Sequence, residues 1–191
     1  MAARLIVVPV SEATYRRLAE EDFEATWELV CGHLRKKPGM TLRHNAISRS
    51  LARELESRLP SGYTVAYNTA RLRLPGGDHY VPDVVVMPDE IVNRYWDETS
   101  VEAYREPASL VVQVRSPSTG DYDATDKLAG YQERGDLEIW LVDPSAQRVT
   151  AYVLGGASGY EQRVHPRGRV KLSAIPGVEV DLDRVFRSAR L

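Results

Sequence analysis

Apolar residues recur along the chain with two different periods, and each change of period marks a predicted element. Residues Ser11 to Glu21 begin with a serine and continue in helix-forming residues, which predicts a short helix with Ser11 as its N-cap. Residues Phe23 to Pro38 partly alternate between apolar and polar. This alternation predicts a strand or a hairpin that turns near Cys31 and Gly32.

The clearest helical period runs from Leu42 to Leu59. Its apolar stripe consists of His44, Ile47, Leu51, Leu55 and Leu59. Positions three and four apart share one face of an α-helix, so this stripe faces a core while Arg49 and Arg53 point away from it. Pro60 and Gly62 follow the stripe and end the helix.

The next stretch favours strands. Residues Tyr63 to Leu74 alternate, and the turn-forming residues 75–78 separate them from a second run, Tyr80 to Met87. The two runs therefore predict one hairpin. Residues Asp89 to Pro107 are polar and without a clean period, which predicts an irregular or partly helical excursion.

The second half of the chain alternates strands and one helix. Residues Leu110 to Val114 predict a buried strand, and residues Asp121 to Arg134 predict a helix that Gly135 ends. Two further strands, Leu137 to Val142 and Val149 to Leu154, flank a turn at Asp143 and Pro144. The tail adds a strand near Arg169 to Leu172 and an apolar cluster formed by Val178, Val180, Leu182, Val185 and Phe186. This order predicts an α/β or α+β fold with a central mixed β-sheet flanked by helices.

Composition narrows the class of protein. The 191 residues suit one domain, and 43% hydrophobic and 27% charged residues are usual for a globular chain. A formal charge of −2 gives no overall attraction to nucleic acid, so any anion-binding surface has to be local. Cys31 is the single cysteine, and the chain has neither a signal-like start nor a membrane-spanning apolar run. We therefore expect no internal disulfide, no membrane contact and a cytoplasmic location.

Two polar residues interrupt the apolar runs. Asp83 stands at the mouth of a strand, and Gln113 lies inside LVVQV, where an amide without partners costs about 1–3 kcal/mol. Each has an ordinary explanation, namely a strand-end aspartate bonded to a backbone N–H and a satisfied core glutamine. Arg115 follows on the same strand face, and Lys127 lies on the next helix at the margin of its apolar stripe. The ordinary explanations for these cations are a solvated strand end and an exposed pair with Asp123.

Together, these residue types suit metal-assisted phosphodiester hydrolysis. Mg²⁺ prefers carboxylate and carbonyl oxygens and lowers the pKa of a bound water. A lysine or arginine then offsets the charge that builds on the phosphate. Other chemistries fit less well, since Cys31 lies in an apolar strand context typical of an inert thiol. The three aspartates at 121, 123 and 126 lack the spacing of a calcium loop.

The same segments resemble a known family. VPDVVV at residues 81–86 and the long run SLVVQV to VDP at residues 109–144 resemble the Uma-two family of restriction-endonuclease-like proteins, within the PD-(D/E)XK nuclease superfamily. The similarity extends downstream to PGVEVDLDRVF at residues 176–186 and, more weakly, upstream to WELVCGHL at residues 27–34 and to His44. The resemblance implies a single restriction-endonuclease-like domain over residues 1–191, with residues 1–22 as a helical extension and residues 23–191 as its core. It also implies Mg²⁺ or Mn²⁺ as cofactor and DNA as substrate.

The resemblance assigns roles to individual residues. Asp83 matches the aspartate of the PD element, Gln113 occupies the position of the glutamate, and Lys127 matches a lysine placed on the helix. Glu28 would complete the metal shell, although a solvent-facing strand glutamate is the ordinary alternative. His44 would contact the scissile phosphate or a water, whereas its place on the apolar stripe is typical of a core histidine.

The chain departs from the family pattern at two positions. Gln113 replaces a glutamate. Its carbonyl can still ligate a metal beside Asp83, but the change removes one negative charge and weakens metal affinity. Arg115 stands where a standard strand of this superfamily carries lysine; as a catalytic residue its guanidinium can stabilise a phosphorane but cannot act as a base.

Three functions follow from these patterns. The leading hypothesis is a Mg²⁺-dependent DNA endonuclease, for which cleavage of both strands would be easiest as a homodimer. The second is a nucleic-acid-binding or interaction module that kept the fold without cleavage, with Arg35, Lys36, Lys37, Arg71 and Arg73 as phosphate contacts. The third is a metal-dependent hydrolase of another substrate, for which the sequence offers no specific residue.

Overall fold

A six-stranded sheet forms the centre of the protein. The computed structural model describes residues 9–22, 24–98, 101–115, 127–155 and 159–189. The strands of the sheet are, in order, β10 (Tyr160–His165), β9 (Arg148–Leu154), β8 (Glu138–Asp143), β7 (Leu110–Val114), β6 (Val84–Pro88) and β3 (Tyr63–Tyr67). Neighbours run antiparallel except β7 and β8, which are parallel, so the sheet is mixed as predicted.

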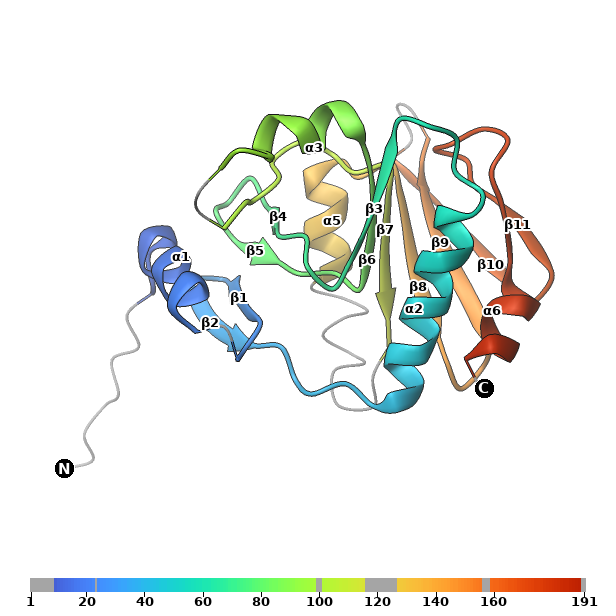
Figure 1. The fold of residues 1–191 in the computed structure, drawn as a ribbon, viewed down its shortest axis with the longest axis horizontal. Coiled ribbons are helices and arrows are strands. Elements are labelled where there is room, and N and C mark those ends of the chain that lie inside the picture. Colours follow the sequence, from blue (N-terminus) through green and yellow to red (C-terminus); the bar gives the residue numbers. More distant parts are fainter. Residues whose placement is uncertain (1–8, 23, 99–100, 116–126, 156–158, 190–191) are drawn as a thin grey trace.

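Helices cover both faces of this sheet (Figure 1). On one face, α2 (Leu42–Glu56) packs with α6 (Leu182–Ser188), and the core includes Leu51 and Val112. On the other face lie α3 (Asp89–Tyr95) and α5 (Leu128–Arg134), and the core there includes Val111 and Tyr131. Alternate residues of β7 thus enter opposite cores, which explains why its sequence is almost continuously apolar.

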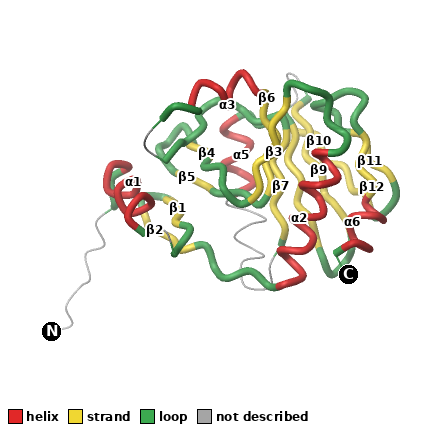
Figure 2. The backbone as a smooth tube through the Cα atoms, in the orientation of Figure 1, coloured by secondary structure: helices red, strands yellow, loops and turns green. Residues whose placement is uncertain are grey.

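A second, smaller sheet lies beside the first (Figure 2). Its strands are β2 (His33–Lys36), β1 (Trp27–Val30), β5 (His79–Tyr80) and β4 (Leu72–Arg73), in that order. Helix α1 (Glu12–Glu21) packs its buried Tyr15 and Ala19 against Leu29 of β1. A two-stranded ribbon of β11 (Arg169–Lys171) and β12 (Glu179–Asp181) completes the fold.

The hairpin predicted from residues 63–87 pairs antiparallel as expected, but it is divided between the two sheets. β3 pairs with β6 in the large sheet, whereas β4 pairs with β5 in the small one. The break falls at Asn68, whose φ of 55° is left-handed and cannot continue a strand. Its N–H donates to the carbonyl of Asp83 at 3.0 Å. Asp83 consequently lies where the chain passes from the small sheet to the large one.

Most other predicted elements are present. Ser11 caps α1 by accepting a hydrogen bond from the N–H of Thr14, and Gly135 follows α5 with a left-handed φ of 80°. Strand β10 and helix α6 were not predicted, and Leu59 lies beyond the end of α2. Residues 121–126 of the predicted helix lie outside the described part of the chain. None of the described helices is long and apolar enough to cross a membrane.

We predict that Gly130→Ala destabilises the protein, although alanine favours a helix by up to about 1 kcal/mol. A Cβ at Gly130 would lie 2.6 Å from both the Leu74 side chain and the Tyr80 ring, where α5 meets the small sheet. Overpacking of this kind costs about 1–3 kcal/mol. Urea unfolding measures the change, with Gly39→Ala as the control because nothing lies within 4 Å of a Cβ there. An unchanged or raised stability of Gly130→Ala would contradict the close packing.

Candidate functional site

Strands β6 and β7 bring Asp83 and Gln113 together. Val84 pairs with Val112, and the N–H of Asp83 donates to the carbonyl of Val112 at 3.1 Å. The side chains of Asp83 and Gln113 therefore leave neighbouring strands on the same face of the sheet. They are 0% and 1% exposed, and Gln113 Nε2 lies 3.1 Å from Asp83 Oδ2.

Four groups of the described residues lie within hydrogen-bonding distance of the Asp83 carboxylate. Lys37 Nζ lies 2.8 Å from Oδ1. The other three reach Oδ2, with the N–H of Val114 at 2.7 Å, Gln113 Nε2 at 3.1 Å and His44 Nε2 at 3.2 Å. A carboxylate offers about four lone-pair sites in all. Protein hydrogens thus take most of the capacity of this oxygen pair.

Lys37 binds Asp83 and two further acceptors of the protein, whereas the sequence predicted that it contacts phosphate. Its ammonium donates to Asn68 Oδ1 at 3.1 Å and to the Val81 carbonyl at 3.0 Å, in addition to Asp83. An ammonium has three donors, so all three are used. Its side chain is 7% exposed. The phosphate contact was predicted because Lys37 ends a run of basic residues. Only the packing of the two sheets against each other places it beside Asp83.

His44 lies on α2 as predicted, with its ring turned into the site. Nε2 lies 3.0 Å from the carbonyl of Val114 and 3.2 Å from Asp83 Oδ2. Both neighbours are acceptors, so Nε2 carries a proton. Nδ1 is buried and makes no hydrogen bond within the described part of the chain. His44 thus positions Asp83 from the helix side.

The charge state of Asp83 follows from opposing causes. Burial raises the pKa of Asp83, but the ammonium of Lys37 and the hydrogen bond from His44 outweigh it and hold that pKa well below its usual range. Asp83 is therefore an ionised acceptor. The Gln113 amide must turn its NH₂ group toward it, and Gln113 Oε1 accepts from the Tyr131 hydroxyl at 3.3 Å.

Glu28 and Lys127 form a second buried ion pair. Lys127 Nζ lies 2.9 Å from Glu28 Oε1, and their side chains are 3% and 4% exposed. Glu28 Oε1 also accepts from the N–H of Val81 at 2.7 Å. Since the carbonyl of Val81 accepts from Lys37, one backbone residue joins both pairs. The structure therefore brings together two predicted site residues, but as partners of each other.

As arranged, these residues do not fit a divalent cation. Mg²⁺ needs near-octahedral oxygen ligands, whereas N–H groups of Lys37, Gln113 and Val114 point at the Asp83 oxygens. Each carboxylate is already neutralised by one lysine. Among the described residues, no three His, Cys, Asp or Glu side chains form a set that could hold a metal ion.

The remaining predicted residues lie elsewhere. Arg115 is half-exposed and lies 3.7 Å from Asp143 Oδ2 at the end of β8. Arg73 makes two hydrogen bonds to Glu12, at 2.8 and 2.9 Å. Arg71 lies near Tyr15. Burial raises the pKa of Tyr15 to about 12, and the positive charge of Arg71 opposes this increase. Arg71 and Arg73 thus hold α1 against the small sheet.

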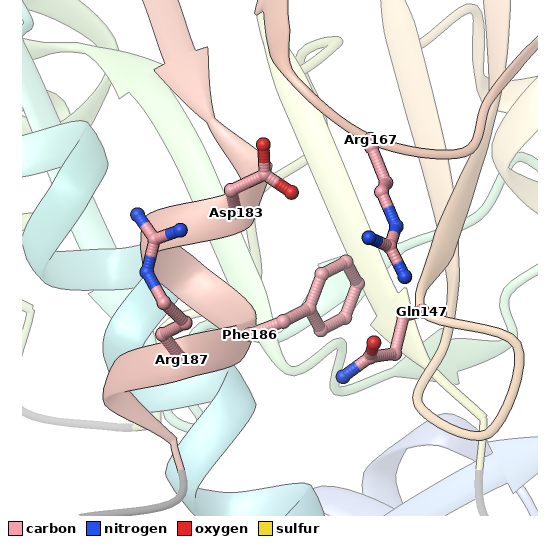
Figure 3. A pocket seen from close by; sticks show the side chains of 5 residues that line it. All are labelled: Gln147, Arg167, Asp183, Phe186 and Arg187. Atoms are coloured by element: carbon pink, nitrogen blue, oxygen red, sulfur yellow. The ribbon is translucent and has the colours of Figure 1, made fainter.

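A cavity of about 320 Å³ lies away from Asp83, beside α6 (Figure 3). It is lined by Gln147, Arg167, Asp183, Phe186 and Arg187. The ring of Phe186 lies between α6 and the segment that carries Arg167. None of the residues of the two buried ion pairs lines this cavity.

Comparisons with known proteins agree with this fold. A family profile described as "Uma2: Putative restriction endonuclease" matches residues 13–183. The crystal structure of "a putative nuclease belonging to DUF820" from Anabaena variabilis is similar with a TM-score of 0.77 and 19% identity, covering 95% of this chain and 99% of that chain. At this identity the likeness shows the fold, and it confirms the predicted nuclease-like architecture. No curated protein matches the chain.

We predict that Lys37→Met destabilises the protein by about 3–5 kcal/mol, the cost of breaking a buried ion pair from one side. The variant leaves Asp83 ionised and buried without its nearest cation. Lys36→Met is the matched control, since it removes the same charge from an exposed neighbour and should change stability by less than about 0.5 kcal/mol. Chemical denaturation compares the two. Equal, small effects would show that Asp83 does not depend on Lys37.

We also predict an acid-dependent contribution from Glu12. The hydrogen bond from Arg73 lowers the pKa of Glu12 from 4.5 to about 2. A lowered pKa in the folded state stabilises the fold above the unfolded value and loses that effect as the pH falls toward 2. The stability advantage of the wild type over Glu12→Gln should thus be full above pH 4.5 and vanish near pH 2. Unfolding measured across this pH range tests the prediction, with the exposed Glu21→Gln as control. A stability advantage that stayed constant over the range would contradict the ion pair between Glu12 and Arg73.

Proposed function

The chain belongs to the Uma2 family, and from this premise we propose that it engages nucleic acid but cleaves phosphodiester bonds weakly or not at all. Family membership supplies the substrate class. The environment of Asp83 is the reason to propose weak or absent cleavage.

One contact carries this proposal, the hydrogen bond from Gln113 Nε2 to Asp83 Oδ2 at 3.1 Å. A glutamate in this place would set two carboxylates against each other, and such a pair is stable only with a proton or a cation between them. The glutamine amide instead donates directly to Asp83. The substitution thus removes the electrostatic demand for a metal ion.

The two lysines point the same way. In phosphoryl-transfer sites a lysine acts by presenting its charge to the phosphate. Here the ammonium groups of Lys37 and Lys127 are buried against Asp83 and Glu28. Their positive charges are therefore paired with carboxylates of the protein and are not directed at a substrate.

One observation favours a second candidate, a Mg²⁺- or Mn²⁺-dependent DNA endonuclease. Asp83, Lys37, Glu28 and Lys127 are all nearly fully buried at one place. Burying ions costs several kcal/mol each, and apolar residues would often be as stable. A fold that keeps such a cluster has a use for it beyond stability, and catalysis is one such use.

Plasmid cleavage in Mg²⁺ or Mn²⁺ separates the two candidates. We predict background cleavage for the wild type and a gain for Gln113→Glu of about 10- to 100-fold, the scale on which changes around a metal site act. The double variant Asp83→Ala/Gln113→Glu should return to background.

The control is Gln162→Glu, which adds the same charge at an exposed position of β10. Efficient cleavage by the wild type that Asp83→Ala abolishes would overturn the weak-cleavage proposal in favour of the endonuclease. Cleavage that survives Asp83→Ala would remove Asp83 from both candidates.

A further inference from the structure

Arginines gather on the side of α2 that faces away from the core. Arg49 and Arg53 are exposed and lie four residues apart, so they share one face of the helix about 6 Å apart along its axis. Within the described residues neither forms an ion pair with an acidic side chain. Their charge is available to a ligand.

Helix α6 supplies the other wall of a groove. A cavity of about 220 Å³ lies between the two helices, and Arg184 of α6 faces Arg49 and Arg53 across it. The hydroxyls of Ser50 and Ser188 bridge the helices at 2.6 Å. The groove therefore presents guanidinium and hydroxyl groups, which are the groups that bind phosphate oxygens.

A buried carboxylate fixes part of this arrangement. Glu54 is 5% exposed and lies 3.2 Å from Arg58 and 3.5 Å from Arg184 through its two oxygens. Glu54 orients Arg184 without neutralising Arg49 and Arg53. The groove keeps a positive excess in a chain whose formal charge is −2.

The positive surface continues along α6. Arg187 lies one turn after Arg184 and is exposed. In Figure 3 its guanidinium points away from the ring of Phe186, although Arg187 also lines the neighbouring cavity. Arg187 extends the cationic surface of the helix beyond the groove.

The chemistry of the groove distinguishes between classes of partner. Large exposed apolar side chains among the described residues are Leu42, Trp96, Leu137, Leu154 and Val164, and none of them lines the groove. A membrane surface or a protein partner would require such apolar anchors. A phosphodiester backbone requires only the cations and hydrogen-bond donors that are present.

We propose that the groove between α2 and α6, formed by Arg49, Arg53 and Arg184, binds the phosphate backbone of nucleic acid. This inference rests on the proposed function, that the chain engages nucleic acid, and it names the surface that does so. Arg49 and Arg53 contact neighbouring phosphates, and Arg184 holds the strand from the opposite wall. The basic residues that the sequence suggested for this role, Lys37 and Arg73, are held by carboxylates of the protein itself.

The test measures binding of the full chain to a short fluorescent DNA duplex by anisotropy, over a series of salt concentrations. We expect Arg49→Ser/Arg53→Ser to bind at least tenfold more weakly than the wild type. The slope of log affinity against log salt should fall by about 2, since each lost phosphate contact removes about 0.9. Thermal melting checks that both exposed substitutions leave the fold intact.

The matched control is Arg94→Ser/Arg105→Ser, which removes two arginines from a different cavity that also contains Glu98 and Glu106. It should bind within twofold of the wild type. The groove is not the binding surface if Arg49→Ser/Arg53→Ser binds as tightly as the wild type, or if the control loses as much affinity. Either result leaves the proposed function standing. A wild type that does not bind DNA at low salt overturns both, and binding to polyglutamate in place of DNA would assign the groove to an acidic protein.

Discussion

The ion pair between Lys37 and Asp83 is the interaction on which the rest of the site depends. Asp83 is fully buried, and an isolated carboxylate in that position would cost several kcal/mol. Lys37 directly follows β2 of the small sheet, whereas Asp83 directly precedes β6 of the large one. The same contact that neutralises the carboxylate therefore also fixes how the two sheets meet.

Gln113 and Val81 extend this constraint through the protein. Gln113 bonds Asp83 on one side and accepts from Tyr131 of α5 on the other. Val81 accepts from Lys37 through its carbonyl and donates to Glu28 through its N–H, which links the pair of Glu28 and Lys127. Among the described residues, Asp83 and Glu28 thus each have a lysine as partner.

Local pattern in the sequence predicted the elements but not their long-range partners. The stripe of α2, the caps at Ser11 and Gly135 and the strand β7 depend on residues close in sequence, and these predictions are confirmed. The expected hairpin is split at Asn68, whose backbone is left-handed. The residue type alone does not predict that conformation. Lys127 was expected as a free cation or as a partner of Asp123, yet Glu28 pairs with it from about a hundred residues away. The basic run that ends at Lys37 gave no sign of its partner, because only tertiary packing brings Lys37 to Asp83.

The central claim is that Gln113 closes the Asp83 site to divalent cations. Its most direct test is a nuclear magnetic resonance titration of the wild-type protein with Mn²⁺, following the side-chain NH₂ signals of Gln113. Mn²⁺ broadens the signals of nearby protons, so a closed site predicts that the Gln113 signals persist when Mn²⁺ is present in equal amount. Loss of these signals at that ratio, with distant side-chain amides such as Gln162 unaffected, would contradict the claim and show a metal bound beside Asp83.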